Sequence, residues 1–380
     1  MRRLFALVAT VVLVDTMFYS AITPLLPHYV DELGLSKSAA GVLSAAYAAG
    51  TLIGSLPSGW LAARFGARRT ILVGLSLMAS SSLAFAFANQ IVILDVARFA
   101  QGIGGACAWT GGLAWLLTVA PEGRRGELIG SALAAAIVGV LLGPVLGAAA
   151  TLAGPEPVFS GVAVVGAVLA AWALALPVPA PTSAPRVRDV ATTMLSAPVL
   201  AGVGLVALPS LFAGTINVLA PLRLDELGAS GLAVGAVFLV SAAVEAVFTR
   251  WFGQISDRHG RMAPIRAGLL AAALAALLLP VPATVLLEGV AVMAAILALG
   301  LLWAPAMALL SDAAEVRGLD LGFAAALVNL AWAGGQVIGG TGSAGLAEAT
   351  SDAIPYLAVA GVCALTSVLL LSAQRRPVGA

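Results

Sequence analysis

The tetrapeptide Asp-Glu-Leu-Gly at residues 31–34 recurs 194 residues later, at residues 225–228. Further identities keep this offset, and they pair Gly41 with Gly235, Gly59 with Gly253, Arg64 with Arg258, and Gly66 with Gly260. Matching landmarks in one ungapped register predict an internal duplication, as in proteins built from structural repeats. Each half of the chain is therefore expected to have the same topology.

The composition places both halves in a membrane. Of the 380 residues, 61% are hydrophobic and 10% are charged, and the mean hydropathy is +1.05. A water-soluble protein of this length covers its surface with more charge than this. Apolar runs of roughly 20 residues can cross a bilayer as helices, which pair their own backbone polar groups. We expect twelve of them, near residues 4–27, 39–62, 70–88, 91–119, 127–150, 157–179, 197–222, 231–251, 262–281, 284–310, 320–346 and 353–373.

These observations predict an all-α membrane protein of twelve transmembrane helices in two pseudo-symmetric six-helix bundles. The first bundle covers residues 1–180 and the second covers residues 197–380, with a proline-rich cytoplasmic linker at 181–196. Because six is an even number, both bundles have the same orientation and are related by an axis along the membrane normal.

The basic residues predict the orientation. With a cytoplasmic N-terminus, 16 of the 19 Lys and Arg residues fall in inner loops and tails, so both termini are expected in the cytoplasm. Scattered arginines form no basic stripe, and nucleic-acid binding is not expected. The strong preference for Arg over Lys favours a bacterial source and hence a multi-pass protein of the inner (plasma) membrane.

The chain offers little chemistry for a cofactor. Its two cysteines, Cys107 and Cys363, both fall in apolar spans, where they are expected to pack as small residues. With two histidines and no Cys/His cluster, we expect no metal and no cofactor. The sequence has no Ser/His/Asp set that a membrane enzyme could use. It also has no phosphate-binding loop of the kind that ATP-driven transport needs.

Two loops carry a family resemblance. Residues 59–69 read Gly-Trp-Leu-Ala-Ala-Arg-Phe-Gly-Ala-Arg-Arg, and residues 253–261 read Gly-Gln-Ile-Ser-Asp-Arg-His-Gly-Arg. Both resemble the signature loop of the major facilitator superfamily, Gly-x-x-x-Asp-Arg-x-Gly-Arg, which locks the cytoplasmic face of the outward-open state. The first copy has Ala63 in place of the aspartate, so the lock is expected to depend on Asp257, Arg258 and Arg261.

Other spans extend the resemblance over the whole chain. Residues 98–106 look like the fourth-helix motif Arg-x-x-Gln-Gly-x-Gly, and residues 139–147 resemble the Gly-x-x-x-Gly-Pro-x-x-Gly motif of the antiporter branch. Asp15 followed by prolines at 24 and 27 is similar to drug:proton antiporters, and residues 14–19 are similar to vesicular amine transporters. The resemblance implies gating roles for Gly59, Arg64, Gly66, Gly253, Asp257, Arg258, Gly260, Arg261, Gly139, Gly143, Pro144 and Gly147.

Charged residues inside spans are costly and indicate function. Asp15 lies ~16 Å from the inner surface and Arg98 ~20 Å, so both are expected near the midplane. We expect Asp15 to bind a proton or a cationic substrate but not both, which would yield antiport at one carboxylate; a structural Asp15–Arg98 pair is the alternative. Asp95 is expected to have a structural role, either alone or paired with Arg98. Glu245 either joins the cavity or extends towards the cytoplasm.

The predicted function is proton-coupled export of small lipophilic or cationic compounds by alternating access. A proton-coupled transporter of a sugar or other metabolite is the alternative, and a non-transporting sensor is disfavoured by the set of gating motifs. The expected partners are the small-molecule substrate, protons and the lipid bilayer, with the protein acting as a monomer. Candidates for the proton or substrate site are Asp15, Arg98, Glu245, Tyr19, Gln101, Asn217, Asn329 and Gln336, with Trp109, Trp303 and Trp332 as aromatic walls.

Overall fold

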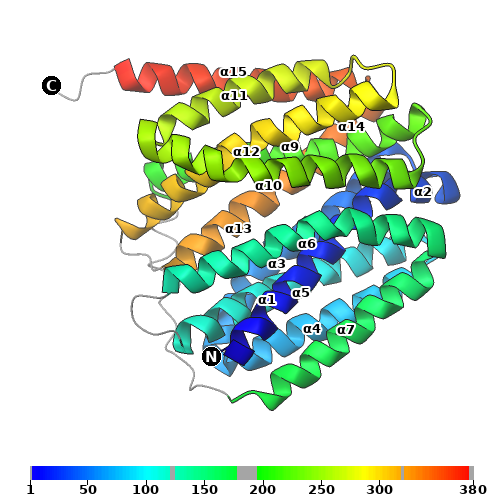
Figure 1. Cartoon of the computed structure of the whole chain (residues 1–380), viewed down its shortest axis with the longest axis vertical. Helices are drawn as coiled ribbons and strands as arrows, with labels where there is room; N and C mark the ends of the chain where they lie inside the picture. The colour runs from blue at the N-terminus through cyan, green and yellow to red at the C-terminus, as the bar shows by residue number, and fades with distance from the viewer. Residues whose placement is uncertain (1, 120–124, 178–194, 318–320, 376–380) are drawn as a thin grey trace.

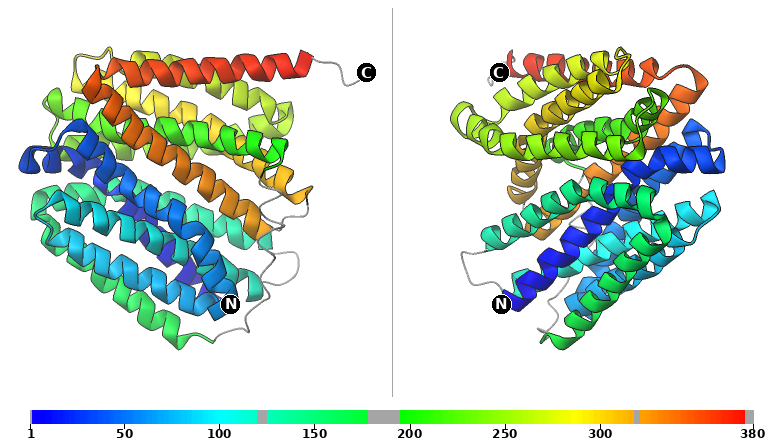
Figure 2. Two further views of the ribbon diagram at one scale, coloured as in Figure 1. Left: turned by 180° about the vertical axis from the view of Figure 1, so that it is seen from behind. Right: turned by 45° about the vertical axis from the view of Figure 1, so that its right-hand side comes forward.

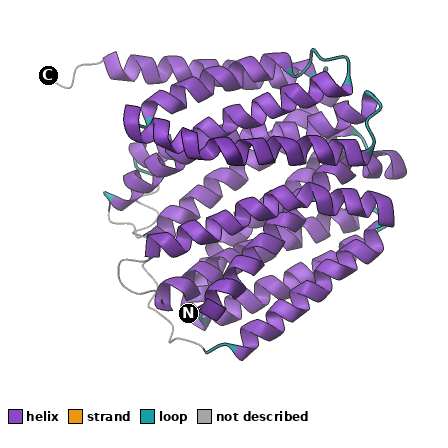
Figure 3. Ribbon diagram, viewed as in Figure 1, coloured by secondary structure: helices purple, strands orange, loops and turns teal. Residues whose placement is uncertain are grey.

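Helices form almost all of the regular structure in the computed structural model, which describes residues 2–119, 125–177, 195–317 and 321–375 (Figure 3). The first half contains α1 (Arg2–Ser20), α2 (Ile22–Leu33), α3 (Lys37–Phe65), α4 (Ala67–Ala86), α5 (Ile91–Val119), α6 (Arg125–Ala153) and α7 (Pro155–Ala175). The second half contains α9 (Ala197–Glu226), α10 (Gly231–His259), α11 (Met262–Leu278), α12 (Val285–Glu315), α13 (Leu321–Val337), the π-helical turn η1 (Ile338–Gly342), α14 (Ser343–Ala349) and α15 (Ala353–Arg375). Figure 1 shows the two halves as two groups of helices.

Ten of the helical stretches in the described residues are long and apolar enough to cross a membrane. The other two predicted spans are α11, which has 17 residues, and the stretch α13–η1–α14, which a π-helical turn interrupts. Glycines at 339, 340 and 342 occupy that turn. The first predicted span also differs, because α1 and α2 meet at Ala21. Pro24 and Pro27 supply no amide hydrogen to the preceding turn, which weakens the helix there.

The backbone repeats as the sequence does. Gly34 and Gly228 both have positive φ, 61° and 90°, and both follow the repeated Asp-Glu-Leu. Gly66 and Gly260 form a second pair with φ of 89° and 76°. A side chain would be strained at such angles, so glycine is needed where each helix ends. The matched turns indicate that the two halves share one local structure.

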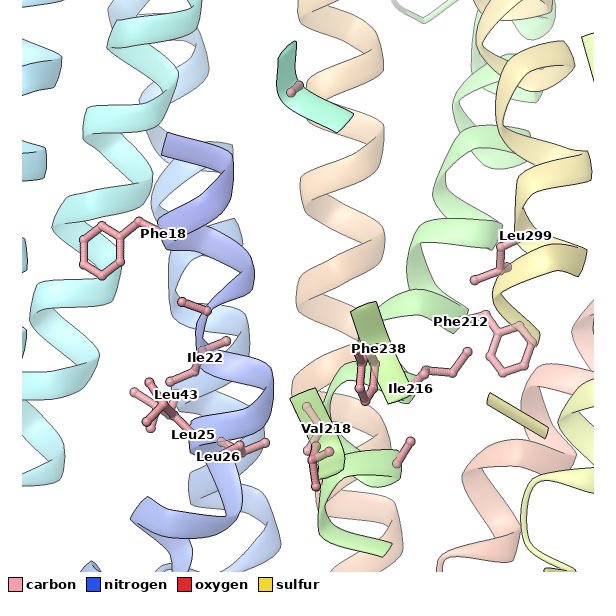
Figure 4. Close-up of a cluster of buried hydrophobic side chains, with 14 of the residues drawn as sticks. Phe18, Ile22, Leu25, Leu26, Leu43, Phe212, Ile216, Val218, Phe238 and Leu299 are labelled. Atoms are coloured by element: carbon pink, nitrogen blue, oxygen red, sulfur yellow. The ribbon is translucent and has the colours of Figure 1, made fainter. Parts of the chain in front are cut away.

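One large apolar core contains residues of both halves, and a smaller one lies in the second half. Figure 4 shows Phe18, Ile22 and Leu43 on the helices of the first half, and Phe212 and Leu299 on helices of the second. Phe18 packs against Phe85 and Phe159 with ring centroids 6.2 and 5.3 Å apart, which joins α1 to α4 and α7. Large residues exposed on the outer helix faces, such as Val168 and Leu274, are apolar as a bilayer requires.

The two halves contact each other near one end, which we call the distal end. It contains the α2–α3, α9–α10 and α14–α15 turns, and the opposite, terminal end contains Arg2 and Arg375. At the distal end a Cβ added to Gly41 would lie 2.4 Å from Ala344 Cβ, and one added to Gly235 would lie 3.1 Å from the Pro144 carbonyl oxygen. Figure 2 shows the groups adjoining at this end from two further directions.

Charged groups join the halves at the same place. Lys37 Nζ lies 2.6 Å from Asp352 Oδ1 and 3.4 Å from Glu226 Oε1, and the Ser38 amide donates to Glu348 Oε2 at 2.7 Å. We call Lys37, Glu226, Glu348 and Asp352 the distal ion cluster. Hydrogen bonds from Ser38 hold the pKa of Glu348 below its ordinary value. The predicted linker lies almost wholly outside the described residues, and the division at residues 180 and 197 stays a prediction.

Candidate functional site

Asp15 lies in α1, where it is buried inside the first half of the molecule and 1% exposed. The Tyr47 hydroxyl of α3 donates to its Oδ2 at 2.8 Å, and Trp109 of α5 is a further polar neighbour. Among the described residues, no group hydrogen-bonds Oδ1. Asp15 is therefore turned away from lipid, and exchange of a ligand at this carboxylate requires Tyr47 or its neighbours to move.

Arg98 of α5 stabilises the end of α1. Its guanidinium donates to the carbonyl oxygens of Phe18 at 3.4 Å and Tyr19 at 3.0 Å, and to Gln101 Oε1 at 2.8 Å. Carbonyls in the last turn of a helix lack amide partners, and a cation suits the negative end of the helix dipole. Asp15 and Arg98, both in the described part of the chain, form no ion pair, so the alternative of a direct structural pair is wrong.

Aromatic rings connect this site to the second half. Tyr19 packs against Tyr47 with ring centroids 4.7 Å apart and against Trp332 of α13 at 5.4 Å. The Arg98 guanidinium lies 5.8 Å from the Tyr19 ring and 5.5 Å from the Tyr47 ring. Asn217 of α9 is the polar neighbour of the Tyr19 hydroxyl. Side chains from α1, α3, α9 and α13 thus form one cluster across both halves.

Glycines allow these helices to approach closely. A Cβ added to Gly102 of α5 would lie 1.9 Å from the Tyr47 carbonyl oxygen, and one added to Gly50 of α3 would lie 2.0 Å from the Phe99 carbonyl oxygen. A Cβ on Gly105 would lie 2.4 Å from the Tyr47 hydroxyl and 3.0 Å from both Asp15 oxygens. Such approaches exclude any side chain, so these glycines position the Asp15–Tyr47 pair.

The glycines of the predicted antiporter motif pack on α1, the helix that carries Asp15. Cβ atoms added to Gly139, Gly143 and Gly147 would lie 2.0, 1.7 and 2.2 Å from atoms of α1 and of Ala21. The helix α6 continues through Pro144, which leaves the Val140 carbonyl without an amide partner. The Ser20 hydroxyl donates to that carbonyl at 3.2 Å. The motif therefore supports α1 as well as the contact with α10.

The remaining predicted site residues, Glu245, Asn329 and Gln336, lie on α10 and α13 of the second half. Glu245 contacts Gly300 of α12, where an added Cβ would lie 3.1 Å from the carboxylate. Gln336 is 6% exposed and follows Trp332 by one turn on α13, and Asn329 is half-buried. Trp303 packs against both apolar clusters, one of which spans the two halves. The structure thus joins Asp15, Tyr19, Arg98, Gln101 and Asn217 in one site.

Asp95 borders a different feature. It lines a groove of about 270 Å³ between α3, α5 and α13, together with Val42, Phe99 and Thr341. Val42 and Val96 beside it are 44% and 61% exposed on the outer surface. Arg98 directs its hydrogen bonds to Gln101 and α1, so the predicted Asp95–Arg98 pair is not formed.

The predicted gating loops lie at the terminal end. Arg64 is exposed and lies 5.9 Å from the Phe65 ring, while Arg68 donates to the Leu176 carbonyl oxygen at 3.2 Å. Arg261 forms an ion pair with Asp312 of α12. The side chains of residues 253–259, which include Asp257 and Arg258, fall outside the described residues.

Sequence reasoning missed Tyr47 and the role of Gly105. Tyr47 is one of four tyrosines and lies in the middle of a predicted span. A phenol hydroxyl at that depth needs a buried hydrogen-bond partner, so the position of Tyr47 in the sequence could have indicated its role. Gly105 was part of a quoted motif, but only the distance to Asp15 indicates why it is glycine. The carboxyl of Glu288, fully buried in α12, was also missed.

Comparison with known proteins identifies the fold. A family model described as Major Facilitator Superfamily matches residues 8–339, with a second match over residues 210–380. This chain belongs to the Major Facilitator Superfamily. The predicted family and the all-α fold of a multi-pass membrane protein are confirmed.

Two relatives and two solved structures illustrate the range of the superfamily. The chain is 31% identical over 126 residues to the quinolone resistance protein NorA of Staphylococcus aureus, covering 33% of this chain and 32% of NorA. It is 30% identical over 176 residues to the vesicular acetylcholine transporter of Drosophila melanogaster, covering 39% and 30%. The chain therefore aligns with about a third of the length of each relative.

The structural likeness covers nearly the whole chain. The xylose transporter XylE of E. coli matches with a TM-score of 0.73 at 16% identity, over 97% of both chains. A POT family transporter in complex with 5-aminolevulinic acid matches with a TM-score of 0.78 at 15% identity, over 97% of this chain and 95% of the other. These similarities define the fold of this superfamily member, whereas its substrate has to be inferred from the site.

Proposed function

We propose that this transporter is a proton-coupled exporter of small lipophilic or cationic compounds that works by alternating access. It acts as a monomer in a bacterial plasma membrane, with both termini in the cytoplasm. NorA and the vesicular acetylcholine transporter, both among its relatives, are named for quinolone resistance and for acetylcholine. Those names support an organic, partly cationic substrate class for the present chain.

One observation carries the proposal. Asp15 offers a carboxylate whose Oδ1 has no hydrogen-bond partner in the described part of the chain, within a cluster of Tyr19, Tyr47 and Trp332. Aromatic faces attract organic cations, and a single carboxylate can hold a proton or neutralise a cation. Competition between the two at Asp15 couples export to proton entry without a second site.

The conformation agrees with loading from the cytoplasm. The contacts between the halves at Gly41, Gly235 and Lys37 are at the distal end. With both termini in the cytoplasm, this state is closed to the outside, and substrate reaches the aromatic cluster from within. Movement of Tyr47 away from Asp15 then opens the carboxylate to the ligand.

The loops at the terminal end are proposed to hold the cytoplasmic face closed in the outward-open state. In the first half, Gly66 ends α3 and Arg68 reaches the end of α7. In the second, Gly260 ends α10, and Arg261 pairs with Asp312. These attachments support a rigid loop at each equivalent position. We propose that Asp257 and Arg258 supply the inter-bundle part of this lock.

Replacement of Asp15 tests the proposal. Purified Asp15→Asn protein in proteoliposomes is expected to lose pH-gradient-driven transport of a panel of organic cations, because the amide can neither carry the proton nor neutralise the ligand. Asp31→Asn removes an exposed carboxylate of α2 and serves as the matched control with unchanged transport. Full cation transport by Asp15→Asn would refute the proposal. Transport of xylose or another sugar by the parent, with none of the cations, would favour the metabolite alternative.

A further inference from the structure

Glu288 is a second buried carboxyl group, which the site around Asp15 does not explain. It lies in the first turn of α12 and is 0% exposed. Neither of its carboxylate oxygens has a hydrogen-bond partner among the described residues. An ionised carboxylate in such surroundings is destabilised, which favours the neutral acid. A buried acid of this kind inside a membrane protein indicates a functional site.

The groups that face Glu288 come from two helices. Arg223 of α9 and Tyr356 of α15 are the charged or titratable side chains that influence it in the described structure. Arg223 donates to Glu226 at 3.2 Å and to the Pro282 carbonyl oxygen at 3.3 Å. In this state the Arg223 guanidinium bonds to these two groups and not to Glu288, although its charge favours a carboxylate there.

A cavity at the distal end borders two of these groups, Arg223 and Tyr356. It has a volume of about 180 Å³, and its lining includes Arg223, Asp352 and Tyr356. The Tyr356 hydroxyl is buried and has no partner among the described residues. Asp352 lies one turn before Tyr356 and belongs to the distal ion cluster. A polar space of this size has room for several water molecules at ~30 Å³ each.

We propose that Glu288 is a second proton-binding site, separate from Asp15, that exchanges its proton with the distal side through Tyr356 and this cavity. Neither Glu288 nor Tyr356 has a hydrogen-bond partner among the described residues in this state, so on release the Tyr356 side chain first moves to within hydrogen-bond distance of Glu288. The carboxyl O–H then gives its proton to the Tyr356 hydroxyl oxygen, and the Tyr356 O–H gives its own to a cavity water. Arg223 then stabilises the carboxylate. The role in transport rests on the proposed proton coupling, whereas proton binding by Glu288 does not.

Loss of the proton from Glu288 also alters the ionic contacts between the halves. Glu226 is shared by Arg223 at 3.2 Å and Lys37 at 3.4 Å. When Arg223 turns to a negative Glu288, Glu226 is left to Lys37 alone. Protonation of Glu288 therefore changes the charge balance of the distal ion cluster.

Infrared spectroscopy of the full-length protein in lipid nanodiscs tests the site directly. At neutral pH the parent is expected to show a protonated-carboxyl C=O band that Glu288→Gln lacks. Glu156→Gln, which removes an exposed carboxyl at the start of α7, and Asp15→Asn are both expected to keep that band. An unchanged spectrum in Glu288→Gln overturns the proposal. Glu288→Asp, which retains the acid, is expected to keep the band at a shifted frequency and guards against a folding artefact.

Exchange of this band into D2O tests the route. Tyr356→Phe removes the relay hydroxyl and is expected to slow exchange at Glu288 several-fold; an unchanged rate overturns the route through Tyr356. The two proposals fail separately. Loss of the band in Glu288→Gln, combined with full cation transport by Asp15→Asn, would support Glu288 as a proton site and refute antiport at Asp15.

Discussion

The Tyr47 hydroxyl donates a 2.8 Å hydrogen bond to Asp15 Oδ2, and the ring of the same side chain lies 5.5 Å from the Arg98 guanidinium. Tyr47 thus stands between two buried, oppositely charged groups that form no ion pair. In this arrangement Asp15 Oδ1, which has no hydrogen-bond partner among the described residues, can bind a ligand, while Arg98 donates its hydrogen bonds to carbonyls at the end of α1.

Removing the Tyr47 hydroxyl is expected to weaken the site. In Tyr47→Phe the carboxylate loses its observed donor, and a hydrogen bond to a charged group contributes roughly 1.5–3 kcal/mol. Transport that depends on the ionised form of Asp15 should fall about tenfold or more, and its pH profile should move to higher pH, because the neutral acid becomes relatively more stable. Proton-driven uptake measured in proteoliposomes over a range of pH provides the check.

Tyr29→Phe is the matched control for that variant. Tyr29 is 2% exposed, and its hydroxyl has no hydrogen-bond partner within the described residues. The same chemical change there is expected to leave both rate and pH profile unaltered. If both variants behaved alike, the hydrogen bond to Asp15 would have no special role.

A methyl group at residue 105 is expected to disrupt the same pair. In Gly105→Ala the new Cβ would lie 2.4 Å from the Tyr47 hydroxyl, and relief of such overpacking costs about 1–3 kcal/mol. Cation binding, measured by displacement of a fluorescent amine, should weaken at least several-fold. Gly161→Ala, on α7 with open space around it, should bind normally and gain slightly in helix stability. Equal binding by both variants would contradict the packing argument.

The fold could be predicted from the sequence because its determinants are local or periodic. Apolar length, arginine placement and the glycines at 34, 66, 228 and 260 act within one span or one turn. The Asp15 cluster was predicted in part, since charge inside a span is visible in sequence. The hydrogen bonds within the cluster could not be predicted, because the pairing of Tyr47 with Asp15 depends on how closely α3, α5 and α1 approach. Asp15 and Arg98 share a depth, and depth alone could not distinguish an ion pair from separate partners.

Lysine cannot replace Arg98 at the end of α1. The guanidinium bonds to two carbonyls and to Gln101 at once, whereas an ammonium is a compact charge without that planar arrangement. With about 1 kcal/mol for each lost bond, Arg98→Lys should destabilise the protein by roughly 2 kcal/mol. Thermal unfolding in detergent measures this. Arg69→Lys alters an exposed arginine near the start of α4 and should unfold at the parent temperature, so an equal loss in both variants would count against the capping role.

Acidification on the distal side is expected to open the contact between the halves. Hydrogen bonds from Ser38 lower the pKa of Glu348, so the closed state favours its anion. The stabilisation is therefore present above the ordinary glutamate pKa of about 4.3 and is lost as the pH falls through the lowered value.

Spin labels on Gln90→Cys and Leu286→Cys, with the native cysteines replaced by alanine, report the distal separation. Their distance should lengthen at low pH in the parent. In Glu348→Gln, which lacks the titrating group, the closed state should already be less populated at neutral pH and should change less on acidification. Glu156→Gln, whose carboxyl is exposed on α7, should follow the parent. A pH response that survives unchanged in Glu348→Gln would contradict the assignment to Glu348.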